Sequence, residues 1–206
     1  RGGARFARAT IGPVPASRVD VAVVGGGAIG LAVAWRARRR GLTVRLLDRG
    51  ELGGGTSRAA AGMLAPVAEA EPAERALLAL TLESARRWPA FAAELEESSG
   101  VAPGYRTCGA LLLARDTDEA EALERERELR ERLGLHVERL LPSAARRAEP
   151  ALAPVLRSAL DLPNDHAVDP RALLGALAEA CRRAGVDLRP HTDVPDPRAL
   201  DAERVV

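Results

Sequence analysis

The sequence contains no lysine and no glutamine, only two cysteines, and few aromatic side chains: two Phe, two Trp and one Tyr among 206 residues. All 30 basic side chains are therefore arginines, a bias that GC-rich coding explains without any functional need. Two distant cysteines, Cys108 and Cys181, are too few for a disulfide framework and lack metal-ligand spacing. We therefore expect a reducing, cytoplasmic compartment and no metal site.

The sequence also lacks a long hydrophobic run and a surplus of either charge. The longest apolar stretch, from Val21 to Trp35, is interrupted by glycines and is shorter than the roughly 20 residues that span a bilayer, so we expect no membrane segment. A net charge of +1 excludes nucleic-acid binding by bulk electrostatics. An apolar content of 47% predicts a real core, and the length fits one domain, alone or with a small insert.

The first predicted elements form a βαβ unit. Residues 1–17 mix Gly, Arg, Ala and Pro without a period, and we interpret them as a flexible leader. The β-branched run at 19–24 predicts a buried strand. A helix is predicted at 28–40 and a second strand at 42–48. Strand, helix and strand within about 30 residues indicate a right-handed unit with parallel strands.

Three glycines join the first strand to the helix in the pattern GxGxxG. Gly25 allows a tight turn, Gly27 lets the backbone approach a pyrophosphate, and Gly30 lets helix and strand pack closely. The second strand ends at Asp48, where an acidic side chain binds ribose hydroxyls. This carboxylate disfavours the 2′-phosphate of NADP, although Arg49 lies next to it. The pattern favours a dinucleotide site over a glycine-rich turn without a ligand, and it leaves NAD and FAD open.

A run of small side chains follows the second strand, in the sequence GGTSRAAAGMLAP at 54–66. Thr56 and Ser57 are predicted to cap a helix whose N-terminus faces phosphate or ribityl oxygens. Ala60, Ala61 and Gly62 leave room for a flat ring system against the backbone. From the residues alone, an alanine-rich helix start without a ligand explains the run equally well.

The rest of the chain alternates helical and extended patterns. The predicted elements are a helix at 74–99 bent at Pro89, a strand at 107–114, a charged helix at 116–133 with i,i+4 pairs Glu121–Arg125, Glu126–Arg130 and Glu128–Arg132, strands and turns at 136–168, a helix capped by Asp169 and ended by Gly185, and strands at 186–189 and from 204. We divide the chain into a nucleotide-binding domain, residues 18–100 and 166–206, and an insert at 101–165.

Several of these segments resemble the D-amino-acid-oxidase family of FAD enzymes, and within it the glycine oxidases. They are the strand–GGGAIG–helix opening, Asp48, the segment GTSRAAAGMLAP, the segment YRTCGAL at 105–111 and the segment VDPR at 168–171. The resemblance covers about residues 18–190. It implies FAD as the cofactor and an α/β fold, in which a Rossmann-like FAD-binding domain, a parallel sheet with helices, is interrupted by a smaller α+β substrate domain. The C-terminal part of such a protein is expected to be missing here.

The resemblance also implies where the cofactor contacts lie. They are Gly25, Gly27, Ala28, Ile29 and Gly30 at the pyrophosphate turn, Asp48 and Arg49 at the adenosine ribose, Thr56 and Ser57 along the phosphates, and Ala61, Gly62 and Met63 near the isoalloxazine. For Met63, a core-filling role is the alternative to a place at the reactive face of the flavin.

The implied activity is oxidative deamination of glycine, or of a small amine or D-amino acid, to an imine and then a 2-oxo acid, with O₂ reduced to H₂O₂, as in thiamine thiazole formation. One alternative is another FAD amine oxidase or dehydrogenase acting on sarcosine or a D-amino acid. The other is a truncated FAD-binding module without catalysis. The oligomeric state stays open, a homo-oligomer included.

The sequence departs from the family in the residues that bind substrate. The arginine that clamps the substrate carboxylate is expected beyond residue 206, so we assign no catalytic residue and expect the chain to be inactive alone. Arg106 and Arg171 are candidate clamps without supporting spacing. His136, His166 and His191 lack metal spacing and are predicted to be surface or turn residues.

Overall fold

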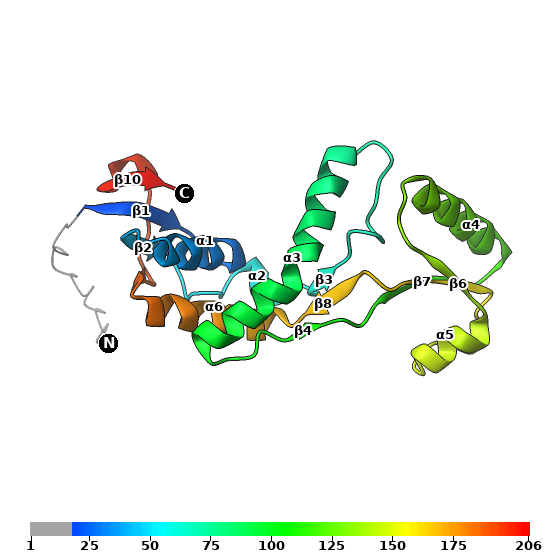
Figure 1. The fold of residues 1–206 in the computed structure, drawn as a ribbon. Coiled ribbons are helices and arrows are strands. Elements are labelled where there is room, and N and C mark those ends of the chain that lie inside the picture. The colour runs from blue at the N-terminus through cyan, green and yellow to red at the C-terminus, as the bar shows by residue number, and fades with distance from the viewer. Residues whose placement is uncertain (1–17) are drawn as a thin grey trace, which may run out of the picture.

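A computed structural model of the protein describes residues 18–206. The described chain forms three separate sheets with helices packed around them (Figure 1). A four-stranded sheet lies at one end of an elongated molecule, a short three-stranded sheet lies in the middle, and a second three-stranded sheet with two helices forms the other end. The predicted leader, residues 1–17, lies outside the described residues.

The four-stranded sheet is parallel throughout, with the order β10-β1-β2-β9. Its strands are β1 (Val19–Val24), β2 (Val44–Leu47), β9 (Asp187–Arg189) and β10 (Ala202–Val205). Because β1 and β2 are central and covered on both faces, they carry nearly continuous Val and Leu runs. The strands predicted in these four places are confirmed.

Helices α1 (Ala28–Arg39) and α6 (Pro170–Ala184) share one core with the side chains of β1 and β2. Trp35 and Leu177 are 1% exposed at its centre. Asp169 caps α6 as predicted, because its carboxylate accepts hydrogen bonds from the first amides of that helix. On the opposite face of the sheet, the chain between β9 and β10 packs against Ala22 and Leu47.

Helix α3 (Arg75–Ser99) brings the aromatic residues together. The helix continues through Pro89 without a break, but it is bent, so that its two halves run in different directions (Figure 1). Phe91 lies edge-on to Trp35 of α1, with ring centroids 5.7 Å apart, and edge-on to Trp88 at 5.3 Å. Trp88 in turn stacks on Tyr105 at 5.9 Å. Within residues 18–206, the Trp, Phe and Tyr side chains thus all join α3 to its neighbours.

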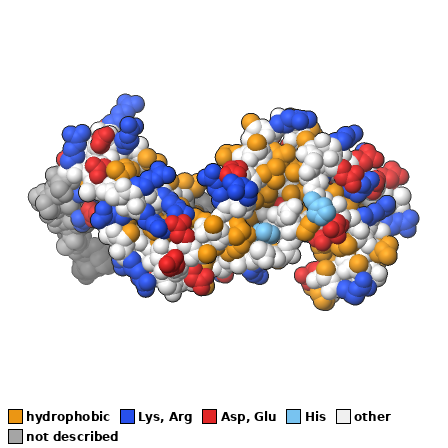
Figure 2. Space-filling model, in the orientation of Figure 1, with side chains coloured by type: hydrophobic (Ala, Val, Ile, Leu, Met, Phe, Trp, Pro, Cys, Tyr) orange, Lys and Arg blue, Asp and Glu red, His pale blue; other side chains and the backbone are white. Residues whose placement is uncertain are grey.

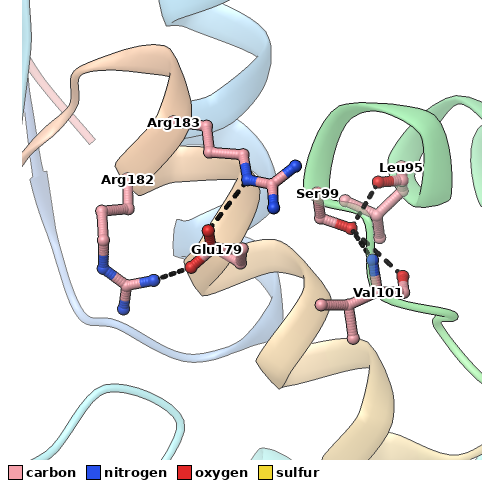
Figure 3. A network of polar contacts seen from close by, with 6 residues as sticks. All are labelled: Leu95, Ser99, Val101, Glu179, Arg182 and Arg183. Atoms are coloured by element: carbon pink, nitrogen blue, oxygen red, sulfur yellow. Dashed lines mark hydrogen bonds and ion pairs between the residues drawn. The ribbon is translucent and has the colours of Figure 1, made fainter.

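The C-terminal end of α3 lies beside α6 (Figure 3). The Ser99 hydroxyl donates to the carbonyl of Leu95 at 2.7 Å and accepts from the amide of Val101 at 3.0 Å. It thereby pairs the Val101 amide, which lies just past the end of the helix. On α6, Glu179 forms an ion pair with Arg183, so charged side chains cover the exposed side of this contact.

The middle sheet is antiparallel and connects the two ends of the molecule. Its order is β3-β8-β4, and its strands are β3 (Met63–Leu64), β8 (His166–Val168) and β4 (Tyr105–Arg106). Residues more than 100 positions apart in the sequence are therefore paired here. One short helix, α2 (Thr56–Ala59), precedes β3.

The third sheet is also antiparallel, with the order β5-β7-β6. The strands and helices of this end are β5 (Ala110–Ala114), α4 (Thr117–Arg132), β6 (Glu138–Leu140), α5 (Pro142–Ala148) and β7 (Ser158–Leu162). A 3₁₀ turn (Pro197–Ala199) precedes β10 in the parallel sheet. The helix α5 was not predicted, because strands and turns were expected at 136–168. Pro142 occupies its first turn, where the missing N–H has no cost. The strand predicted from 107 begins only at Ala110, because Gly109 has a φ of +69°.

The predicted ion pairs on the charged helix α4 are largely wrong. Of the three, the described structure shows the pair of Glu126 with Arg130. The other two sets of side chains are exposed, where such a pair gains only a few tenths of a kcal/mol. Arg127 instead pairs with Glu124 and Glu131, three residues before it and four after it.

Candidate functional site

The site begins at the turn between β1 and α1. Gly25 has a φ of +112°, a conformation that L side chains rarely adopt. A Cβ on Gly30 would lie 1.9 Å from the carbonyl oxygen of Gly25, so helix and strand pack this closely only without a side chain. These are the roles predicted for the two glycines.

The N-terminus of α1 follows this turn. Gly27 is the N-cap and supplies no side-chain cap, so the first-turn amides lack intrahelical partners. The amide of Ala28 donates to the Ser57 hydroxyl at 3.1 Å, and a Cβ on Gly27 would lie 3.0 Å from the same oxygen. Ile29 is 82% exposed. The amides and the positive end of the helix dipole therefore provide an anion-binding surface.

Asp48 lies against the same turn. Its carboxylate accepts from the amide of Gly26 at 2.6 Å and from the amide of Gly50 at 2.7 Å. The tertiary structure thus brings the acid predicted at the end of β2 to the glycine loop. Arg49, its neighbour, is exposed.

The prediction that Thr56 and Ser57 cap a helix is wrong. Helix α2 begins at Thr56, its N-cap is Gly55, and no side chain caps it. Ser57 instead turns toward α1, because the amide of Ala28 is a free donor there. Thr56 is exposed.

The segment from Ala61 to Met63 leads into strand β3. Gly62 has a φ of +83°, and a Cβ there would lie 2.0 Å from the carbonyl oxygen of Val168. The amide of Val168 donates to the Gly62 carbonyl at 2.8 Å. Ala61 is exposed, and the side chain of Met63 is 65% exposed. Within the described residues, Met63 therefore does not fill a core.

A cavity of about 220 Å³ opens beside Met63, between this segment and the N-terminal half of α3. Its walls are apolar with glutamates at several positions, and they comprise Met63, Leu64, Ala65, Pro66, Glu69, Ala70, Glu71, Glu74, Leu77, Leu78, Thr81, Ser84, Ala85 and Trp88. Neither candidate clamp, Arg106 or Arg171, lines it. Both arginines are exposed and near Asp169, whose pKa the capped amides and these charges lower.

Two of the three histidines are where the sequence predicts them. His136 and His191 are exposed and contact Glu138 and Glu51 respectively. His166 is different, because it lies in β8, is partly buried, and its Nδ1 is hydrogen-bonded to the Tyr105 hydroxyl. Burial raises the pKa of Tyr105.

Sequence reasoning missed two buried charged side chains. Arg130 is 3% exposed and Asp165 is fully buried, and both bind the backbone that follows β3. Arg130 lies among many arginines of a charged helix, so no feature of its sequence neighbourhood separates it from them. Asp165 carries a weak signal, as an acid between two short apolar strands.

The described part of the chain has no helix with the length and hydropathy needed to cross a membrane. Within residues 18–206, no three or more His, Cys, Asp or Glu side chains gather in a way suited to a metal ion. Basic and acidic side chains are interspersed over the face shown in Figure 2, in keeping with the net charge of +1.

Comparison with known proteins shows which family this chain resembles. Residues 20–206 match the family described as DAO, FAD dependent oxidoreductase. Glycine oxidase from Geobacillus kaustophilus is 37% identical over 190 residues, which cover 92% of this chain and 50% of that protein. A protein named as a thiamine biosynthesis oxidoreductase, ThiO, from Rhizobium etli is 34% identical over 189 residues, which cover 88% of this chain and 53% of that protein.

Solved structures agree with these relatives. A crystal structure of glycine oxidase from Geobacillus kaustophilus matches with a TM-score of 0.81 and 37% identity, over 87% of this chain and 48% of that one. Glycine oxidase from Bacillus cereus matches with a TM-score of 0.80 and 31% identity, over 88% of this chain and 48% of that one. The chain thus spans about half the length of these relatives. Because the family match runs from residue 20 to residue 206, this chain belongs to the DAO family of FAD-dependent oxidoreductases, whose cofactor is FAD.

Proposed function

We propose that this chain holds FAD for the oxidation of glycine or another small amine. One observation carries the proposal: the glycine loop, the N-terminus of α1, the Asp48 carboxylate and the Ser57 hydroxyl meet at the carboxyl ends of β1 and β2. Ligands of open parallel sheets bind at this end of the strands. The names of the glycine oxidase relatives support the choice of substrate class.

The glycine loop fits a pyrophosphate because it packs without side chains, so that its backbone amides can approach a ligand closely. A Cβ on Gly26 would lie 2.6 Å from Leu52, and one on Gly27 would contact Ser57. We assign the pyrophosphate to the amides of Gly27 and Ile29, at the positive end of the α1 dipole. Ser57 lies next to them, and Thr56 is one residue further from the loop.

Asp48 fits the adenosine ribose because its carboxylate keeps acceptor capacity. A carboxylate has about four lone-pair sites, and the amides of Gly26 and Gly50 occupy two of them. The same two bonds fix the carboxylate in place before any ribose binds. Arg49 is exposed beside it and free to contact the same sugar.

The segment from Ala61 to Met63 fits the isoalloxazine. It presents two exposed side chains on either side of Gly62, whose backbone is held against Val168. The flavin, when bound, supplies acceptance of the α-hydride of the amine and transfer of electrons to O₂. The chain's own contribution is to place the ring beside a cavity of about 220 Å³.

We further propose that residues 18–100 and 166–206 form the FAD-binding unit and that residues 101–165 form the substrate-side insert. The separation of the parallel sheet from the β5-β7-β6 sheet supports this division. The finer assignments, glycine as the substrate, H₂O₂ as the product and a place in thiamine formation, rest on the resemblance to glycine oxidases and to ThiO.

The cofactor assignment is tested by titrating the chain with FAD and following flavin fluorescence. Asp48→Ala removes charge-assisted hydrogen bonds of about 1.5–3 kcal/mol, so we expect FAD to bind about 10- to 100-fold more weakly. The matched control is Asp20→Ala. Asp20 lies at the start of β1, away from the glycine loop, and its carboxylate also accepts from a backbone amide, that of Thr43. Equal FAD affinity for the two variants contradicts the ribose assignment.

The reaction is tested with the complete reading frame that contains this chain. We expect H₂O₂ from glycine, measured by a coupled peroxidase assay, and a panel with sarcosine and D-alanine ranks the substrates. A flavin-loaded protein that reduces its flavin with none of these amines contradicts an amine oxidoreductase. Preference for sarcosine or a D-amino acid replaces glycine as the substrate and retains the class.

A further inference from the structure

The loop after β3 is held by two buried side chains of opposite charge. The Asp165 carboxylate accepts from the amide of Val67 at 2.9 Å and from the amide of Ala68 at 2.7 Å. Arg130 donates from Nε to the carbonyl of Val67 at 2.9 Å and from Nη2 to the carbonyl of Ala68 at 2.6 Å. Two consecutive residues thus have both of their backbone polar groups bound by side chains from distant parts of the chain.

Burying these two charges is costly, so the arrangement needs a reason. Transfer of an ionised group from water costs several kcal/mol even after relaxation, and a buried pair is weak evidence for added stability. Val67 is buried, so its backbone amide and carbonyl need partners within the protein, but neutral side chains could supply them. What the charged side chains add is a fixed position, because a guanidinium fork and a carboxylate accept little displacement of their partners.

The two side chains come from the insert and act on the FAD-side segment. Arg130 lies near the end of α4, and Asp165 precedes β8. In Figure 1 the loop after β3 runs between α3 and α4. The side chain of Val67 is 1% exposed and packs in the core of the β5-β7-β6 sheet, against Leu160 among others.

The pairing of β3 with β8 connects this loop to Met63. Directly after Asp165, strand β8 pairs with β3, with Ala167 opposite Met63, and the amide of Val168 donates to Gly62. Residues 62–64 are therefore paired with residues 166–168, and the Asp165 side chain binds the backbone of residues 67 and 68 a few positions further on. A shift of the loop at residues 67 and 68 is therefore expected to disturb the strand that carries Met63.

We propose that Arg130 and Asp165 are positioning residues, which fix Met63 and the neighbouring flavin segment by clamping the backbone of Val67 and Ala68. The inference rests on the proposed function, because the position of Met63 matters to a reaction only if the flavin lies against residues 61–63. It couples the insert to the cofactor: the part of the chain that faces the substrate sets the place of the segment that faces the ring.

The clamp itself is tested without flavin, by amide hydrogen exchange. Asp165→Asn replaces one acceptor oxygen by an NH₂ group, so exchange at Val67 and Ala68 should accelerate about tenfold or more. The matched control is Asp169→Asn, because Asp169 also accepts two backbone amides but not those of the loop. Unchanged exchange at residues 67 and 68 in Asp165→Asn overturns the clamp.

A second variant covers the case in which Asp165→Asn does not fold. Arg130→Lys keeps the positive charge and loses the fork that reaches two carbonyls. We expect the loop amides to exchange faster while the amides of α1 and α6 keep their protection. Unchanged amide exchange at residues 67 and 68 in this variant likewise overturns the clamp.

The positioning role is tested in the complete flavin-loaded protein. Asp165→Asn should shift the visible absorption bands of the bound flavin and raise KM for the amine, whereas Asp169→Asn should change neither. If amide exchange at residues 67 and 68 accelerates while the flavin spectrum and KM stay unchanged, the positioning role is overturned and a structural role is left. If the wild-type protein binds no FAD, the proposed function fails and the flavin-directed part of this inference fails with it, while the exchange result still decides whether the clamp exists.

Discussion

Gly30→Ala tests the close contact between α1 and β1 on which the cofactor site depends. The new Cβ would lie 1.9 Å from the carbonyl oxygen of Gly25 and 3.3 Å from Val23. Carbon and carbonyl oxygen in contact are about 3.3–3.6 Å apart, so the helix must move away from the strand. The blocking atom belongs to the backbone, which has no rotamer to relieve the overlap.

The size of the effect follows from three contributions. Forced overpacking costs about 1–3 kcal/mol, and a backbone obstacle places this site at the upper end. Moving α1 also loosens buried Leu31 and Trp35, which adds a smaller loss of packing. Against this, alanine in a helix is favoured over glycine by about 1 kcal/mol. We expect a net destabilisation of about 2–4 kcal/mol.

Gly175→Ala is the matched control, because it makes the same substitution in α6 with the opposite expected sign. Gly175 is exposed, and a Cβ there would meet no atom within 4 Å. Helix propensity alone then stabilises the protein by about 1 kcal/mol. The two variants are compared by urea unfolding, followed by tryptophan fluorescence and circular dichroism, with the midpoint and the slope both fitted. If Gly30→Ala is as stable as the wild type or more so, the close-packing argument fails.

Two further predictions concern single ionisable groups. Cys108 is exposed and Cys181 is buried, and desolvation raises the pKa of the Cys181 thiol to about 12. A thiol reagent should therefore label one cysteine in the native protein and two in denaturant. Rapid labelling of both cysteines in the native protein refutes the burial of Cys181. The pKa of Asp169 lies below its ordinary 3.8, because the amides of Ala172 and Arg171 donate to it. Its contribution to stability is present above that pH and lost as the pH falls through the lowered value, so Asp169→Asn should flatten the acid limb of the melting temperature against pH, and an unchanged limb would argue against the cap.

The sequence alone predicts the elements whose signals are local. The β-branched run of β1, the Gly–x–Gly turn and the Asp169–Pro170 helix start each depend on neighbours within a few residues, and the structure has all three. The same holds for Gly30, because the spacing of a strand followed by a helix already requires a missing side chain where they cross. For these residues the backbone conformation follows from residue type.

Other features depend on contacts that no local pattern contains. Ser57 has the sequence of a helix cap, yet its hydroxyl accepts from α1, because the fold brings a free amide there. Pro142 opens a helix rather than a turn because the helix after it finds a core to pack on. Among the arginines of α4, Arg130 is buried, whereas Arg125 and Arg132 are exposed and Arg127 is half-buried.

The sequence by itself therefore predicted the βαβ unit and the family, and it named the residues that we propose lie near the cofactor. Tertiary structure decided what those residues contact: Asp48 is fixed by the amides of Gly26 and Gly50, and Met63 is exposed beside a cavity. It also decided that Asp165 and Arg130 bind the backbone of the same two residues. The physical reason is that hydrogen bonds and burial between residues far apart in the chain depend on its path in space, which spacing along the sequence does not record.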